Sequence, residues 1–292
     1  RAANRRGRRM KWETRALSAA DTRLPDGYET APWGAYAPGV LQRALIGIAR
    51  GSFLHRGRMR YLMTMLIRRL GTPLDVTFQG LRYRIEGRNN LMDYGLLLHP
   101  DYNGEEIRFL RGACAEGGVA VDIGANIGLY SLPLARAVGQ GGRVISIDAN
   151  AAVLQRLKVN ARLSGLDNIT AVACAVGDSI GQVDLEIAHS DLAIVSVTPS
   201  AQGSIPLRPL RDILSDAGIT RVDALKIDIE GFEDAALVPF LETAPDAMLP
   251  RRISIERGGP GRTDYQGCAA AFARKGYRLV GRTRLNSFYE RS

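Results

Sequence analysis

The chain has 292 residues, of which 46% are hydrophobic and 24% are charged. These proportions are ordinary for a folded protein and exclude extensive disorder. The length suits one large α/β domain with an extension, or two small domains. The net charge of +9 is uneven, because residues 1–70 contain 15 Arg or Lys and only 4 Asp or Glu. The basic character therefore belongs to an N-terminal extension.

The cysteines and the apolar runs narrow the class of protein further. Cys114, Cys174 and Cys268 are widely spaced and form no CxxC pair, so neither a disulfide framework nor a zinc site is expected. No apolar run approaches the ~18 to 20 residues that span a bilayer. The Arg-rich start lacks the apolar core of a secretory signal. We therefore predict a cytoplasmic protein with buried thiols.

The N-terminal extension, residues 1–70, is predicted to be irregular over 1–38 and helical over 40–70, with a break near Gly51. In this helical part Leu62, Met65, Leu66 and Leu70 alternate with arginines. A basic amphipathic helix can lie on an anionic membrane or on nucleic acid. Alternatively it packs on the domain with its arginines in water. We keep weak membrane contact open and regard nucleic acid as the less favoured partner.

The remaining chain, residues 71–292, is predicted to be one domain of alternating strands and helices. It begins with a hairpin at 75–86, where apolar residues alternate at period two. Strands are expected at 119–122, 143–148, 169–175, 182–187, 224–229, 252–256, 277–280 and 287–290. Helices are expected at 105–114, 127–138, 151–163, 210–217, 232–241 and 263–275. Residues 191–206 show no clear pattern. This alternation predicts an α/β fold with a mainly parallel sheet covered on both faces.

The most distinctive motif is Val-Ala-Val-Asp-Ile-Gly-Ala-Asn-Ile-Gly at residues 119–128. A short apolar strand ends at Asp122, and Gly124, Asn126 and Gly128 follow before a helical pattern begins. Strand, glycine turn and helix form the unit that brings backbone close to a nucleotide-like ligand. Glycine suits it because it tolerates positive φ and has no Cβ.

An acid at the end of the next strand helps to identify the ligand. Asp148 follows Gly128 by 20 residues, the place from which a carboxylate binds ribose hydroxyls. The glycine spacing is not G-x-G-x-x-G, and Asp122 would disfavour a pyrophosphate but suits a cationic sulfonium group. S-adenosylmethionine is thus the expected cofactor. A nicotinamide-dependent Rossmann oxidoreductase and a non-catalytic binding module remain alternatives.

Two further strand ends carry candidate site residues. Ala175 and Asp178 follow the third strand and could border an adenine ring, although Gly-Asp-Ser is also ordinary turn chemistry. Residues 225–233, Leu-Lys-Ile-Asp-Ile-Glu-Gly-Phe-Glu, place Asp228 and Glu230 at the end of a buried strand. Ligands bind at such ends, and clustered charges there are costly unless they bind something. Glu233 could bind as well, or merely favour the helix that follows.

Together these motifs, with residues 154–160 and Asn168, resemble the FkbM family of S-adenosylmethionine-dependent methyltransferases over about residues 100–290. The resemblance implies a Rossmann-like class I methyltransferase fold, a seven-stranded sheet whose last strand, here 287–290, is antiparallel. It implies O-methylation of a sugar, glycolipid or secondary metabolite. Residues 122–128 would hold the methionine part of the cofactor, Asp148 the ribose, and Asp178 the adenine side.

The chain departs from the family at Asp148-Ala149, where Glu-Pro is usual, and at Leu210-Arg211-Asp212, where Leu-Asp-Asp is usual. A hydroxyl is a weak nucleophile at neutral pH, so a general base would assist. Asp228 and Glu230 are the first candidates for this base, and His189 is the next because an ordinary histidine pKa suits the role. No metal site is predicted, although clustered acids could also hold a divalent cation. The sequence does not identify the methyl acceptor beyond a small molecule or glycan.

Overall fold

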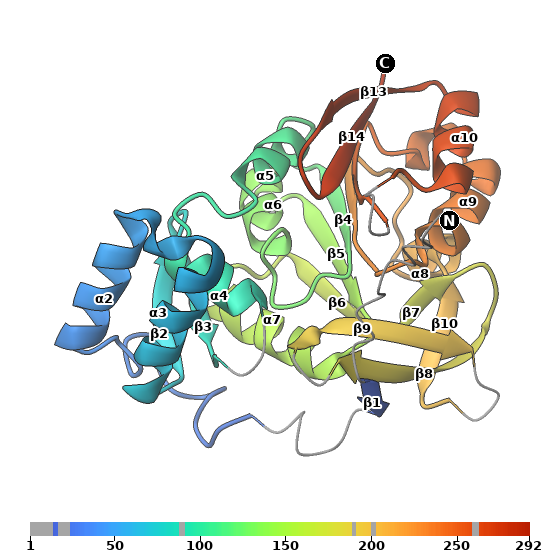
Figure 1. Cartoon of the computed structure of the whole chain (residues 1–292). Coiled ribbons are helices and arrows are strands. Elements are labelled where there is room, and N and C mark those ends of the chain that lie inside the picture. The colour runs from blue at the N-terminus through green and yellow to red at the C-terminus, as the bar shows by residue number, and fades with distance from the viewer. Residues whose placement is uncertain (1–13, 17–23, 88–90, 189–190, 200–202, 259–262) are drawn as a thin grey trace, which may run out of the picture.

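The computed structural model describes residues 14–16, 24–87, 91–188, 191–199, 203–258 and 263–292. Its centre is a seven-stranded sheet in the order β13-β14-β12-β11-β4-β5-β6 (Figure 1). The strands are β4 (Val119–Ile123), β5 (Arg143–Asp148), β6 (Ile169–Ala173), β11 (Ala224–Ile227), β12 (Arg252–Glu256), β13 (Tyr277–Arg282) and β14 (Asn286–Arg291). Strand β14 runs antiparallel to both of its neighbours, and the other adjacent pairs are parallel. The predicted mostly parallel sheet with one antiparallel strand is confirmed.

Both faces of this sheet are covered, because alternate side chains of its central strands point to opposite sides. Ala120 and Val144 belong to one core, whereas Val121 and Ile145 belong to the other. The first core includes α5 (Gly104–Arg111), α6 (Ser131–Val138) and α7 (Ala151–Leu163); the second includes α8 (Leu210–Asp216), α9 (Glu233–Thr243) and α10 (Gln266–Arg274). A ligand can therefore approach the sheet only at the ends of its strands.

The N-terminal helices pack on the first core. They are α2 (Val40–Arg50), the 3-10 turn η1 (Phe53–His55), α3 (Gly57–Arg69) and α4 (Leu91–Leu98), and the hairpin of β2 (Leu74–Phe78) and β3 (Leu81–Ile85) lies between the last two. The predicted hairpin and the helical break near Gly51 are confirmed. Ile46, Met63 and Ile67 are buried in one cluster with the hairpin and α6. The inner face of residues 40–70 is thus part of the domain core. Among the described residues no helix is long and apolar enough to cross a membrane.

A second sheet lies at the front of the view in Figure 1, in the order β1-β8-β10-β7, with β9 paired to β8. Its strands are β1 (Thr14–Ala16), β7 (Ala175–Gly177), β8 (Gly181–Ala188), β9 (Asp191–Pro199) and β10 (Ile205–Pro209). The predicted continuous strand over 169–175 is wrong, because β6 ends at Ala173 and the chain then joins this second sheet. β1, β9 and β10 were not predicted from the sequence. All three lie against β8, a partner that no local pattern specifies.

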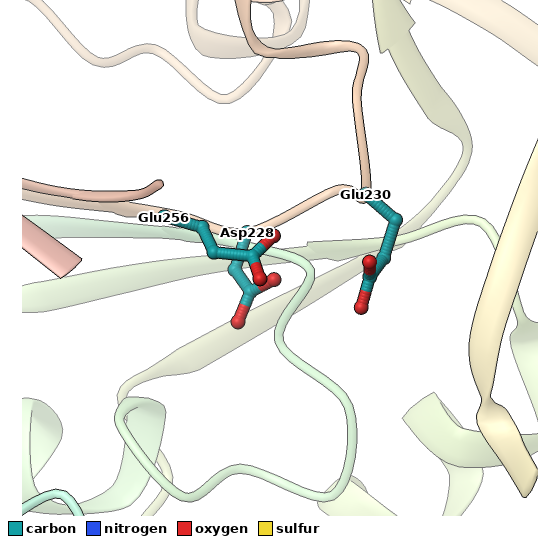
Figure 2. Close-up of side chains that lie close together, drawn as sticks. All are labelled: Asp228, Glu230 and Glu256. Atoms are coloured by element: carbon teal, nitrogen blue, oxygen red, sulfur yellow. The ribbon is translucent and has the colours of Figure 1, made fainter. Parts of the chain in front are cut away.

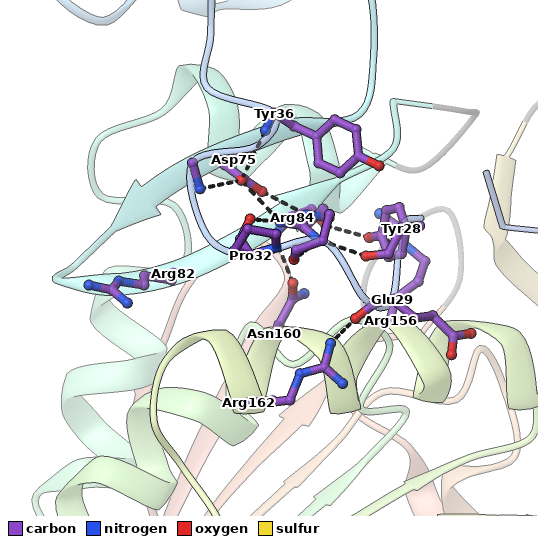
Figure 3. A network of polar contacts seen from close by, with 12 residues as sticks. Tyr28, Glu29, Pro32, Tyr36, Asp75, Arg82, Arg84, Arg156, Asn160 and Arg162 are labelled. Carbon is purple, nitrogen blue, oxygen red and sulfur yellow. Dashed lines mark hydrogen bonds and ion pairs between the residues drawn. The ribbon is translucent and has the colours of Figure 1, made fainter. Parts of the chain in front are cut away.

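Hydrogen bonds around one buried ion pair of the hairpin tie the segment before α2 to the domain (Figure 3). The Arg84 guanidinium, which is fully buried, lies 2.8 Å from the Asp75 carboxylate and donates to the backbone oxygens of Tyr28 and Pro32. The backbone nitrogen of Arg84 also donates to Asn160 of α7, at 2.8 Å. The side-chain amide of Asn160 in turn donates to the backbone oxygen of Ile127, at 3.0 Å. The network therefore reaches the back of the glycine loop that follows β4.

Candidate active site

The glycine loop between β4 and α6 has a left-handed backbone at three of its residues. Gly124, Asn126 and Gly128 have φ values of 74°, 50° and 94°. The predicted helix start at residue 127 is therefore wrong: left-handed residues cannot belong to a right-handed helix, and α6 begins at Ser131. A Cβ at Gly124 would overlap the backbone oxygen of Asp228. Glycine is needed here because two strand ends approach each other closely.

Asp148 at the end of β5 is held beside this loop. One carboxylate oxygen accepts from the backbone nitrogen of Asn126 and the other from that of Asn150, both at 2.8 Å. Burial raises the pKa of Asp148 to about 6, and the two backbone hydrogen bonds oppose this shift. The group is thus largely ionised at neutral pH. Each oxygen keeps a free lone pair with which it can accept from a vicinal diol.

A hollow of about 320 Å³, including its mouth, opens next to Asp148. Its lining is mainly apolar and comes from the ends of β4, β5 and β11 and from the start of β7. The lining residues are Ile123, Gly124, Ile147, Asp148, Ala149, Cys174, Ala175, Val176, Ile229 and Phe232. Apolar walls suit a flat purine, and the carboxylate at the wall suits a ribose, so the residues fit an adenosyl group. Ala175 lines the hollow. Asp178 is exposed and accepts from the Ser179 hydroxyl at 2.9 Å, and its contact with the cofactor stays a prediction.

Asp122 lies beneath the glycine loop and is fully buried. One oxygen accepts from the Ser131 hydroxyl at 2.6 Å, and the other lies 3.6 Å from the Lys226 ammonium. Burial raises the pKa of Asp122, and the charge of Lys226 opposes that rise. Lys226 also donates to the backbone oxygen of Gly124 at 2.8 Å. This pair supports the loop from below, and the predicted contact of Asp122 with the methionine part stays a prediction.

Three carboxylates meet at the ends of β11 and β12 (Figure 2). Asp228, Glu230 and Glu256 each place an oxygen within 4.8 Å of the others. Burial, and then the charges of Asp228 and Glu230, raise the pKa of Glu256 to about 9. Glu256 therefore keeps its proton at neutral pH. Such a set of oxygen ligands could also hold a hard divalent cation. We call these residues the acid trio.

Glu256 was not among the predicted catalytic residues, although its position at a strand end was visible in the sequence. Parallel pairing of β11 with β12 brings the two strand ends together, as expected for strand ends that meet at one edge of a parallel sheet. Glu233 has a structural role, different from that of the acid trio. Its two oxygens accept from the backbone nitrogens of Ile229 and Gly231, each at 2.9 Å. Glu233 therefore shapes the turn that carries Asp228 and Glu230.

A second, polar cleft of about 1040 Å³, including its open mouth, lies on the other side of this turn. Its lining residues are Glu230, Gly231, Glu256, Arg257, Gly258, Thr263, Asp264, Tyr265 and Gln266. Ile229 and Phe232 line the apolar hollow, whereas Glu230 and Gly231 between them line the polar cleft. The two spaces thus adjoin at the acid trio. His189 lies outside the described residues, and its role as a base stays a prediction.

The family described as the methyltransferase FkbM domain matches residues 122–279, more than half of the chain. No curated protein matches the sequence.

Several solved structures resemble the chain at low sequence identity. Trm5b from Pyrococcus abyssi has 13% identity and a TM-score of 0.44, over 74% of this chain and 55% of that one, so the chain spans about half its length. TYW2 from M. jannaschii in complex with AdoMet has 14% identity and a TM-score of 0.40, over 75% and 86%. A precorrin-6y C5,15-methyltransferase from Geobacter metallireducens has 12% identity and a TM-score of 0.43, over 66% and 90%.

Proposed function

Because the chain belongs to the methyltransferase FkbM domain family, we propose that it methylates a hydroxyl oxygen of a sugar, a glycolipid or a secondary metabolite. It is an S-adenosylmethionine-dependent methyltransferase with a Rossmann-like class I fold. The nicotinamide-dependent alternative is therefore set aside. Membership of the family does not specify which atom receives the methyl group or which residues assist the transfer.

The observation that carries the proposal is the position of the acid trio between two spaces of different chemistry. The apolar hollow with Asp148 suits the adenosyl group, and the polar cleft suits an acceptor rich in hydroxyls. Glu230 and Glu256 line that cleft, together with Tyr265. Carboxylates accept hydrogen bonds from hydroxyl groups and can take a proton from one of them. A hydroxyl held by the trio would face the cofactor across the turn.

When bound, S-adenosylmethionine supplies an electrophilic methyl group. The residues of the chain then have to orient the acceptor in line, with its oxygen roughly 3 Å from that carbon, and remove its proton. Glu256 keeps its proton at neutral pH, since its pKa is raised to about 9. Within the acid trio the proton acceptor is therefore Asp228 or Glu230, and Glu256 positions them and the substrate.

The test is methyl transfer from radiolabelled S-adenosylmethionine to a panel of free sugars, glycolipids and phenols, with the labelled atom identified by NMR. Asp228→Asn or Glu230→Gln should lower kcat by about 10²- to 10⁴-fold, the usual contribution of a general base. Affinity for S-adenosylhomocysteine should stay within about twofold, because neither side chain lines the apolar hollow. Glu105→Gln, an exposed acid on α5, is the matched control.

Two results would contradict the proposal. Label found only on nitrogen or carbon of the product would exclude O-methylation. Activity that disappears with EDTA and returns with Mg²⁺ would assign the acid trio to a cation, and proton transfer would then need another residue.

A further inference from the structure

The outer face of residues 40–70, which we call the helical arm, exposes large apolar side chains. In the described part of the chain twelve large hydrophobic residues are exposed, and nine of them belong to this arm. They are Val40, Leu41, Ile48, Phe53, Met59, Tyr61, Leu62, Met65 and Leu70. The exposed fractions of Val40 and Phe53 reach 77% and 72%. Soluble proteins rarely expose apolar groups in such numbers unless the surface binds a partner.

The exposed apolar groups are not spread around the helices. On α2, Val40, Leu41 and Ile48 fall within about 100° of one another at 3.6 residues per turn, whereas Ile46 and Ala49 point inward and are buried. On α3, Met63 and Ile67 supply the buried face. Tyr61, Leu62 and Met65 lie on the opposite, exposed side of that helix. Each helix therefore has an apolar face toward the core and a second one toward the outside.

The charge of the arm has one sign. Residues 30–74 contain seven arginines and no aspartate or glutamate. Arg43, Arg56 and Arg69 are exposed, and among the described residues no ion pair joins an arginine of the arm to a carboxylate. The surface thus combines uncompensated positive charge with exposed aliphatic and aromatic groups.

We propose that the outer face of the helical arm binds the surface of an anionic lipid bilayer. A basic helix with an exposed apolar face lies in the interface, with its apolar groups among the acyl chains and its arginines at the phosphates. Nucleic acid would use the arginines, but exposed Val40, Leu41 and Ile48 gain nothing from a phosphate backbone. A second copy of the chain would bring two positive surfaces together, which Coulomb repulsion opposes.

The arm packs on the domain through its inner face, so the whole protein would be held at the membrane. Ile46 and Ile67 anchor its inner face in the core, and the Arg50 guanidinium donates to the backbone oxygen of Leu97 in α4 at 2.9 Å. No helix has to unfold or insert across the bilayer. The proposal goes beyond the methyl transfer proposed above and does not depend on the identity of the acceptor.

The test is flotation of the full chain with vesicles of phosphatidylcholine, with or without about 30 mol% phosphatidylserine. Binding should require the anionic lipid and weaken as salt rises from about 0.1 M to about 0.5 M. The double variant Ile48→Ser/Phe53→Ser should lower the partition coefficient by about tenfold or more. Arg56→Gln/Arg69→Gln should lower it by about fivefold for each arginine.

Matched controls separate this surface from general effects. Ile180→Ser removes a side chain that is 79% exposed outside the arm, and Arg278→Gln removes an exposed arginine on β13. Both should bind vesicles like the unmodified protein. Affinity for S-adenosylhomocysteine and the melting temperature should be unchanged in every variant, which confirms that the fold is intact.

Four outcomes would overturn the proposal. One is absence of binding to anionic vesicles, and another is equal binding to both vesicle types. A third is tighter binding to duplex DNA or RNA that Ile48→Ser/Phe53→Ser leaves unchanged. The fourth is a dimer, detected by light scattering and lost in that variant, with no binding to vesicles.

Discussion

Replacing Asp148 with asparagine tests the cofactor site. The structure predicts that this change has a small effect on the free energy of unfolding and a large effect on cofactor affinity. The amide has nearly the same shape but offers only one acceptor to the backbone nitrogens of Asn126 and Asn150. The lost bond to a charged acceptor costs about 1.5 to 3 kcal/mol. Removing a carboxylate whose pKa is raised to about 6 regains roughly 3 kcal/mol at neutral pH. The free energy of unfolding should therefore change by less than about 2 kcal/mol.

The affinity for S-adenosylhomocysteine should respond much more strongly. In the cofactor site predicted here, a ribose diol would donate two hydrogen bonds to the Asp148 carboxylate, and the amide could accept only one of them. The lost charge-assisted bond is worth about 1.5 to 3 kcal/mol, so Kd should rise by about ten- to 150-fold. The affinity of the unmodified protein should also rise between about pH 5 and pH 7, since the ionised carboxylate is the better acceptor and its pKa is about 6.

Isothermal titration calorimetry with S-adenosylhomocysteine at pH 5, 6, 7 and 8 measures both effects, and urea unfolding measures stability. Because the folded pKa is raised above the unfolded value, stability from this group should decline as pH rises through about 4 to 6, and the asparagine variant should lack that decline. Asp167→Asn, in the exposed loop before β6, is the control. An unchanged Kd in a folded Asp148→Asn protein would refute the ribose assignment.

Three further predictions concern the loop, the core and the acid trio. Gly124→Ala should abolish cofactor binding and should lower the free energy of unfolding by several times the roughly 1 kcal/mol expected for Gly165→Ala. Gly165 has a similar φ of 71° but open space around it. Calorimetry and urea unfolding compare the two variants, and equal losses of stability would show that the close approach at Gly124 is unimportant. Arg84→Ala should lower the free energy of unfolding by about 3 to 5 kcal/mol, because it leaves the Asp75 carboxylate buried without a cationic partner. Adding Asp75→Asn to this variant should recover part of the lost stability, and no recovery would argue against the ion pair. Glu256→Gln should flatten the dependence of stability on pH. The folded pKa of about 9 lies above the unfolded value, so the stability contributed by the protonated acid is lost as pH rises from about 5 to 9. If the free energy of unfolding, measured with urea, changed with pH in the same way for both proteins across this range, the assignment would be contradicted.

Local chemistry determined those features of the protein that depend on one stretch of chain. The glycine loop could be located because Gly124 and Gly128 follow a short apolar run, and their left-handed backbone is a property of glycine itself. The position of Asp148 at the end of the second strand followed from a strand and a helix whose bounds the structure confirms. The hairpin at 74–85 was visible because its alternation is local.

Tertiary structure decided everything that depends on which segments become neighbours. Glu256 joins Asp228 only because β12 pairs with β11, and Lys226 supports Gly124 from the adjacent strand. The helical arm shows the same limit. Almost every residue from 59 to 67 is apolar, so periodicity alone could not tell whether Met63 or Met65 faces the core. Packing of α3 against α2 and α4 buried Met63 and left Met65 at the surface, because a helix can turn only one face to the domain that covers it.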